Sequence, residues 1–208
     1  GILQWNNEVG NSSMDDFDFW LLNQWGNDSY ADSCNNQSDG SFTSPWEEFE
    51  YINNTGGTIN ANLVVAEYSL VNDPASIVLD YQIYYCPSLL QYNTTNDSLI
   101  GHAAVEEVLS TAAVSASTPD TLESYSSCGP GTIYFPAYEQ RQVPNITGTD
   151  GVNTETGLLG YFDNPFYGTS ASAPHIAAIA ALVWDANPSL NSSQVRNAIT
   201  STAVDLST

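Results

Sequence analysis

Lysine is absent from this chain of 208 residues, which has only two basic residues of the Lys/Arg type, Arg141 and Arg196, against 24 Asp and Glu residues. The formal net charge at pH 7 is -22. Such a surface repels phosphate groups, which argues against nucleic acid or an anionic membrane as a partner. No cofactor is required by the composition and no metal ligand is identified by it, but an oxygen-rich surface is compatible with calcium. The alternative is that the carboxylates only solvate the surface.

Long apolar runs are missing as well. No stretch of about 18 apolar residues occurs, so the sequence predicts no segment that spans a bilayer. Hydrophobic residues nevertheless make up 42% of the chain and aromatic residues 12%. This is enough to build one sizeable core or two small domains, and we expect a globular protein.

Cysteine is scarce: the chain has Cys34, Cys86 and Cys128. Three cysteines are too few for a disulfide scaffold, but in an oxidising compartment one pair is expected, with one thiol left over. We predict a Cys34–Cys86 disulfide, because both residues lie in the first half of the chain. The state of Cys128 is left open.

Asn-X-Ser/Thr sequences, in contrast, are frequent, at about twice the number that the composition predicts by chance. In a eukaryotic secretory route they would carry N-linked glycans and place the protein outside the cell. Asn-rich loops of a bacterial protein would give the same pattern without sugar. The candidate glycosylation sites are Asn11, Asn27, Asn36, Asn53, Asn93, Asn96, Asn145 and Asn191.

The two halves of the chain differ in pattern. Residues 1–90 alternate apolar and polar side chains between turn-rich spacers, which predicts an antiparallel β-sandwich. The predicted strands lie within residues 16–22, 46–52, 59–68 and 77–85. Residues 97–208 contain a buried strand near 109–116, an alanine-rich helix over 170–186 that we expect to be buried, and an amphipathic helix over about 191–202. The fold class is therefore mixed, with part of an α/β domain in the second half.

The most specific stretch is Gly168-Thr169-Ser170-Ala171-Ser172-Ala173-Pro174-His175, a turn that leads into a helix of small residues. A serine hydroxyl is a poor nucleophile until an imidazole accepts its proton. The chain has only two histidines, His102 and His175.

This stretch resembles the nucleophile motif of the subtilisin-like serine proteases. Residues 111–117, 123–130 and 141–152 resemble three further blocks of that family in the same order, and the likeness covers residues 98–208. It identifies residues 97–208 as the C-terminal part of a subtilisin-like α/β domain. Residues 1–90 resemble, more weakly, the jelly-roll or sandwich modules that accompany some members.

The resemblance implies a role for each residue of the motif. Ser170 takes the nucleophile position at the start of a buried helix, whose N–H groups and dipole favour an oxyanion. Pro174 is expected in the first helical turn, where its missing N–H costs nothing. His175 is expected to be structural, and His102 falls in a block where a histidine has no catalytic duty. The family's catalytic Asp, His and oxyanion Asn precede every block recognised here.

Two functions follow from this incomplete site. The one we favour from the sequence is a non-catalytic structural or assembly module of an extracellular complex or filament. The alternative is the serine-bearing part of an active endopeptidase. Half of such a domain leaves an open sheet edge and an uncovered apolar face, so either function needs a partner. The preceding protease segment or further copies of this chain would supply it.

Overall fold

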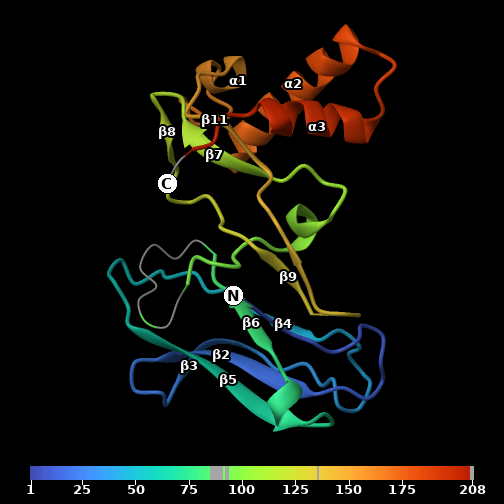
Figure 1. Ribbon diagram of the computed structural model, residues 1–208. Coiled ribbons are helices and arrows are strands. Elements are labelled where there is room, and N and C mark those ends of the chain that lie inside the picture. The colour runs from blue at the N-terminus through green and yellow to red at the C-terminus, as the bar shows by residue number, and fades with distance from the viewer. Residues whose placement is uncertain (85–90, 92–93, 135, 207–208) are drawn as a thin grey trace. The chain divides into compact units, whose positions relative to one another are not determined.

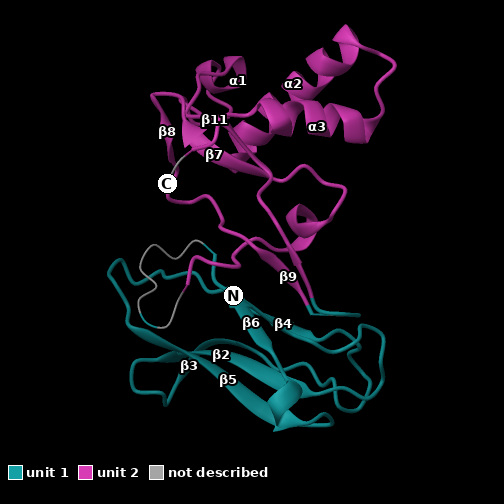
Figure 2. Ribbon diagram, in the orientation of Figure 1, with its two compact units in different colours: residues 1–91, 134–138 teal, residues 92–133, 139–208 magenta. Residues whose placement is uncertain are grey.

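The computed structural model describes residues 1–84, 91, 94–134 and 136–206. The chain forms two compact units (Figure 2). Unit 1 contains residues 1–91 and 134–138, and unit 2 contains residues 92–133 and 139–208. Within the described part of the chain, no helix is long and apolar enough to cross a membrane.

Unit 1 contains two three-stranded antiparallel sheets (Figure 1). In the first, β1 (Ile2–Trp5) lies between β4 (Trp46–Glu48) and β6 (Leu79–Gln82). In the second, β2 (Asp16–Asn23) lies between β3 (Ser29–Ser33) and β5 (Ala61–Ser69). A short 3₁₀ turn, η1 (Pro74–Ser76), begins at Asp73, whose side chain accepts the N–H of Ala75 at 3.0 Å.

The core of unit 1 draws on both sheets. Leu3 and Trp5 of β1 pack with Phe17 and Phe19 of β2, and all four are at least 95% buried. The Trp5 and Phe17 rings meet edge to face with their centroids 5.3 Å apart. The alternating pattern therefore predicted the core strand β2 correctly, because every second side chain of a strand points to the same face.

Unit 2 is built on the parallel pair β7 (Thr111–Ser115) and β11 (Ile146–Asp150), with β8 (Thr118–Leu122) antiparallel to β7. Helix α2 (Thr169–Ala186) packs on β7 and β11, and α3 (Ser192–Thr202) packs on α2. The remaining elements are the 3₁₀ turn η2 (Gly101–Ala104), the hairpin of β9 (Gly131–Ile133) and β10 (Glu139–Arg141), and the short α1 (Glu155–Leu158).

Helix α3, which the sequence predicted over about 191–202, begins at a capping box. The Asn191 side chain accepts the N–H of Gln194 at 2.9 Å, and the Gln194 side chain accepts the N–H of Asn191 at 2.9 Å. This reciprocal pair satisfies two N–H groups that a helix start leaves free. Val195 and Ile199, four residues apart, are the buried positions of the helix.

Two expectations for α2 were wrong. Only Ala171, Ser172 and Ile176 are buried, so the helix contacts the sheet along a narrow stripe, and most of its other residues are exposed. Pro174 lies inside the helix rather than in its first turn. A proline at that position has no N–H to donate to the carbonyl of Ser170, four residues earlier.

Both arginines hold the same segment of unit 2. Arg141 Nη1 donates to the carbonyl oxygen of Ala104 at 2.7 Å, and Arg196 Nη1 donates to that of Glu106 at 2.7 Å. The guanidinium of Arg141 also pairs with Glu139 at 2.9 Å. The two cations of this acidic chain thus bind β10 and α3 to residues 104–106, at and just after the end of η2.

Candidate functional site

Ser170 lies in the first turn of α2 and is exposed. Its hydroxyl makes no hydrogen bond to any described residue, and the N–H groups of Thr169 and Ser170 have no partner among those residues either. Such groups carry the positive end of the helix dipole. The site therefore combines an accessible hydroxyl with donors suited to a developing negative charge.

Gly168 sets the direction in which the chain enters α2. Its φ is 106° and its ψ is 162°, a backbone conformation that is essentially restricted to glycine. The Gly168 carbonyl accepts the N–H of Ala171 at 2.9 Å and that of Ser172 at 3.3 Å. A side chain at this position would change the path of the chain directly before Ser170.

Asp150, at the carboxyl end of β11, holds the other side of the Gly168 peptide. Its Oδ2 accepts the Gly168 N–H at 2.8 Å and the hydroxyl of Tyr125. The Asp150 side chain is completely buried, and its Oδ1 has no hydrogen-bond partner among the described residues. Desolvation, followed by the hydrogen bond and charge of Asp150, raises the pKa of Tyr125, so the phenol remains a donor at ordinary pH.

Neither Asp150 nor Tyr125 was selected from the sequence as a site residue. A carboxylate that follows a short strand is normally solvated, and nothing in the alternation of residues 146–150 marks this one as buried. The available signal was its place at the end of a parallel strand next to a helix start, where α/β proteins gather functional groups.

Close packing joins α2 to the sheet at one point. A Cβ on Gly148 of β11 would lie 2.6 Å from the Oγ and 2.8 Å from the carbonyl oxygen of Ser172. The Ser172 hydroxyl, which is completely buried, donates to the carbonyl oxygen of Ala112 at 2.5 Å. Glycine and serine therefore let the helix approach β7 and β11 closely enough to fix its first turn.

Neither histidine bonds to Ser170. The Nδ1 of His175 lies 2.7 Å from the carbonyl oxygen of Ala171, one turn earlier in α2. His102 is exposed in η2, and its ring forms no hydrogen bond with a described residue. Among the described residues, then, no imidazole is placed to accept the Ser170 proton.

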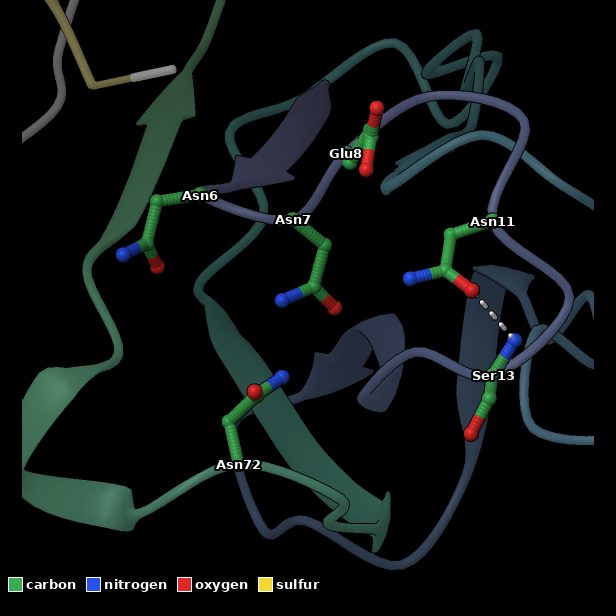
Figure 3. A pocket seen from close by; sticks show the side chains of 6 residues that line it. All are labelled: Asn6, Asn7, Glu8, Asn11, Ser13 and Asn72. Carbon is green, nitrogen blue, oxygen red and sulfur yellow. Dashed lines mark hydrogen bonds between the residues drawn. The ribbon is translucent and has the colours of Figure 1, made fainter. Parts of the chain in front are cut away.

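Among the hollows that described residues line, two bear on this site. One, of about 180 Å³, has a largely apolar lining and adjoins the first turns of α2. It is lined by Val152, Thr154, Thr156, Phe162, Phe166, Ala171, Pro174 and His175. The other, of about 220 Å³, lies in unit 1 and is polar (Figure 3). It is lined by Asn6, Asn7, Glu8, Asn11, Ser13 and Asn72.

The amides of the polar hollow already serve the fold. Asn7 Oδ1 accepts the N–H of Asp15 at 2.7 Å. The side-chain amides of Asn7 and Asn72 donate to the Asp15 carboxylate at 2.9 and 2.8 Å. Asn11 accepts the Ser13 N–H at 3.0 Å, as the dashed line in Figure 3 shows. These amides are engaged by the chain itself, so the first turn of α2 remains the candidate site.

The candidate glycosylation sites differ in accessibility. Asn11, Asn27, Asn53, Asn96 and Asn191 are exposed, Asn36 and Asn145 are half-buried, and Asn93 lies outside the described residues. The Asn145 amide is engaged on both sides: its Oδ1 accepts the Ser110 N–H and its Nδ2 donates to the Gln142 carbonyl, both at 2.9 Å. A glycan on Asn145 would have to grow from a nitrogen that already binds the chain.

Two other predictions concern cysteine and metal. Cys86, the predicted partner of Cys34, lies outside the described residues, so this disulfide remains a prediction. Cys34 is exposed and Cys128 is half-buried. Within the described ranges, no group of three or more His, Cys, Asp or Glu side chains is arranged to hold a metal ion.

Comparison with known proteins places the site in a family. The Subtilase family profile matches residues 10–208. Alkaline elastase YaB of Bacillus sp. (strain YaB) is 30% identical over 133 residues, which are 55% of this chain and 35% of that protein. M-protease of Shouchella clausii (strain KSM-K16) is 41% identical over 56 residues, 27% of this chain and 15% of that protein. Subtilisin-like protease SBT1.9 of Arabidopsis thaliana is 36% identical over 77 residues, 37% of this chain and 10% of that protein.

These matches span about a third or less of the length of each relative. No solved structure matches the chain. The family profile nevertheless covers nearly all of the sequence, including the turn and helix that present Ser170. This chain belongs to the subtilase family.

Proposed function

We propose that the chain is the serine-bearing part of a subtilisin-like serine endopeptidase whose catalytic base comes from polypeptide outside these 208 residues. The observation that carries the proposal is the exposed Ser170 hydroxyl beside free N–H groups at the start of α2. The three relatives, all named as proteases or an elastase, support the reaction class.

The proposed reaction is acyl transfer to Ser170. An imidazole supplied by the completing segment takes the hydroxyl proton as Oγ attacks the substrate carbonyl carbon, and the first-turn N–H groups of α2 stabilise the resulting oxyanion. When the C–N bond breaks, the imidazolium gives that proton to the leaving amine. Water then hydrolyses the acyl ester through the same base and regenerates the serine hydroxyl.

The outer surface of α2 supports a completing segment. Ile179, Leu182 and Trp184 are 44, 70 and 46% exposed. A helix that is hydrophobic on most of its sides is normally buried in the interior of a domain. We propose that the preceding part of the protease domain covers this surface and brings the base to Ser170.

A fluorophosphonate probe tests the proposal, because it phosphonylates an activated serine with loss of fluoride. The full-length protein should be labelled at Ser170, as located by peptide mass spectrometry, and its Ser170→Ala variant should not. Ser189→Ala is the matched control, since it removes an exposed hydroxyl that lies beyond α2. A folded wild-type protein that stays unlabelled would refute the proposal.

The second candidate is the non-catalytic assembly module favoured by the sequence. Its specific support is that neither imidazole in the described residues bonds to Ser170, together with the charge of -22. In that case copies of the chain would cover α2, with calcium bridging the carboxylates of neighbours. Filaments or particles that electron microscopy detects and a chelator loosens would support it, whereas a chelator-indifferent monomer would argue against it.

Two finer features complete the proposal. We propose that unit 1 is a β-sandwich module, because its two sheets share one core of Leu3, Trp5, Phe17 and Phe19. We also propose an extracellular, N-glycosylated protein, with sugar on the exposed sequons first. Intact mass before and after glycosidase treatment tests the second point, and an unchanged mass would contradict it.

A further inference from the structure

We propose that Asp150 is a positioning residue for the nucleophile: its carboxylate fixes the Gly168 peptide and thereby holds Ser170 at the exposed first turn of α2. This inference rests on the proposed protease function for its catalytic consequence. The geometry on which it depends is a property of unit 2 alone.

The connection from Asp150 to Ser170 is short. Asp150 Oδ2 accepts the Gly168 N–H at 2.8 Å, and Ser170 is only two residues further along the chain. Gly168 itself has a φ of 106°, which a free peptide leaves readily. The hydrogen bond that the Gly168 N–H donates to this fully buried carboxylate therefore restricts the backbone dihedral angles of the glycine that precedes Ser170.

The opposite end of this arrangement is also anchored. Tyr125 donates its hydroxyl to the same Oδ2, and the Asp150 carbonyl accepts the N–H of Ala116 at 3.0 Å. The carboxylate is thus held by β11, by Tyr125 and by the end of β7, so it can act as a fixed reference for Gly168. Gly148, the other buried position of β11, also faces α2.

The unpaired oxygen separates positioning from stability. Asp150 Oδ1 is buried without a hydrogen-bond partner among the described residues, and leaving a buried polar atom unpaired costs folding free energy. The Asn variant would keep one oxygen for Gly168 and would place an NH₂ group where no described acceptor lies.

The test measures the saturating rate constant of fluorophosphonate labelling and the melting temperature of the full-length protein. Asp150→Ala should slow labelling by about 10- to 100-fold below its melting temperature, because misplacing a reacting group by about 1 Å has effects of this size. Asp150→Asn should melt lower than wild type but label within about threefold of it. Asp120→Ala, which removes an exposed charge on β8, should label like wild type.

These variants separate the outcomes. Wild-type labelling in folded Asp150→Ala would overturn the inference, and so would losses in Asp150→Ala and Asp150→Asn that follow only their melting temperatures. If Asp150→Ala does not fold, the nearly isosteric Asp150→Leu takes its place.

A second measurement keeps this inference distinct from the proposed function. If the wild-type protein is not labelled at all, the protease proposal fails, and hydrogen exchange of the Gly168 amide decides the positioning role. Slow exchange in wild type that becomes fast in Asp150→Ala supports it. Equal exchange in the two proteins overturns it.

Discussion

Replacing Gly148 by alanine would probe the contact that seats α2 on the sheet. The added Cβ would lie 2.6 Å from Ser172 Oγ, 2.8 Å from the Ser172 carbonyl oxygen and 3.0 Å from Ile176 Cγ1. Cβ atoms do not approach other atoms within 3.0 Å, so α2 must move away from β11. The shift would also break the 2.5 Å hydrogen bond between Ser172 and the Ala112 carbonyl.

The size of the effect follows from two contributions. Overpacking a core by one carbon costs about 1–3 kcal/mol. Leaving the buried Ser172 hydroxyl and its acceptor unpaired costs about 1–3 kcal/mol more. Together they predict a loss of about 2–6 kcal/mol, which lowers the melting temperature of a chain of this length by roughly 4–24 °C.

Differential scanning calorimetry of the full-length protein would measure this loss. Gly57→Ala is the matched control, because a Cβ there meets nothing within 4 Å and the variant should melt like wild type. A Gly148→Ala protein that melts within about 1 °C of wild type would refute the close packing of α2 on β11 and, with it, the account of how Ser170 is presented.

Three further outcomes test other parts of the chain. Asn191→Ala should cost about 0.5–2 kcal/mol in denaturant unfolding because it removes the cap of α3, and no change would contradict the capping role. Although Cys34 is exposed, desolvation by its neighbours, followed by the charges of Asp18 and other carboxylates, raises its pKa to about 12. After reduction its thiol should therefore react with iodoacetamide at pH 8 at least about tenfold more slowly than free cysteine, and an ordinary rate would disprove the shift. Desolvation raises the pKa of Glu47, so its contribution to stability is full below the unfolded pKa of about 4.3 and is lost as pH rises through the raised value. The Glu47→Gln variant should therefore lack this part of the pH dependence of unfolding, and an unchanged profile would exclude Glu47 as its source.

The sequence predicted those elements in which the periodic spacing of apolar residues extends over the whole element. Strand β2 alternates over eight residues, and α3 carries both its cap and its buried positions in the sequence. Strand β3, with the sequence SYADS, has no apolar alternation and was not predicted. It is a strand because the preceding strand β2 supplies its hydrogen-bond partners, and backbone pairing of this kind leaves no signal in the side-chain pattern of β3 itself.

The candidate site shows the same division. The motif around Ser170 could be identified from the sequence, because the residues that form it are consecutive. Its support by Asp150 and Tyr125 could not, since those residues lie 20 and 45 positions earlier and meet only when β11 and α2 are packed together. The burial of α2 was overestimated for a related reason: an apolar helix sequence predicts that a surface will be covered, but not whether the covering polypeptide belongs to the same 208 residues.

The two arginines that bind residues 104–106 make limited digestion with trypsin a simple probe of local unfolding in this chain. That protease cuts only after basic residues, so it has two sites here, and at both the guanidinium it must recognise is already bonded to a backbone carbonyl of unit 2. Cleavage requires these side chains to be released and the backbone of β10 or α3 to open, so the rate of digestion reports the local opening of these two elements.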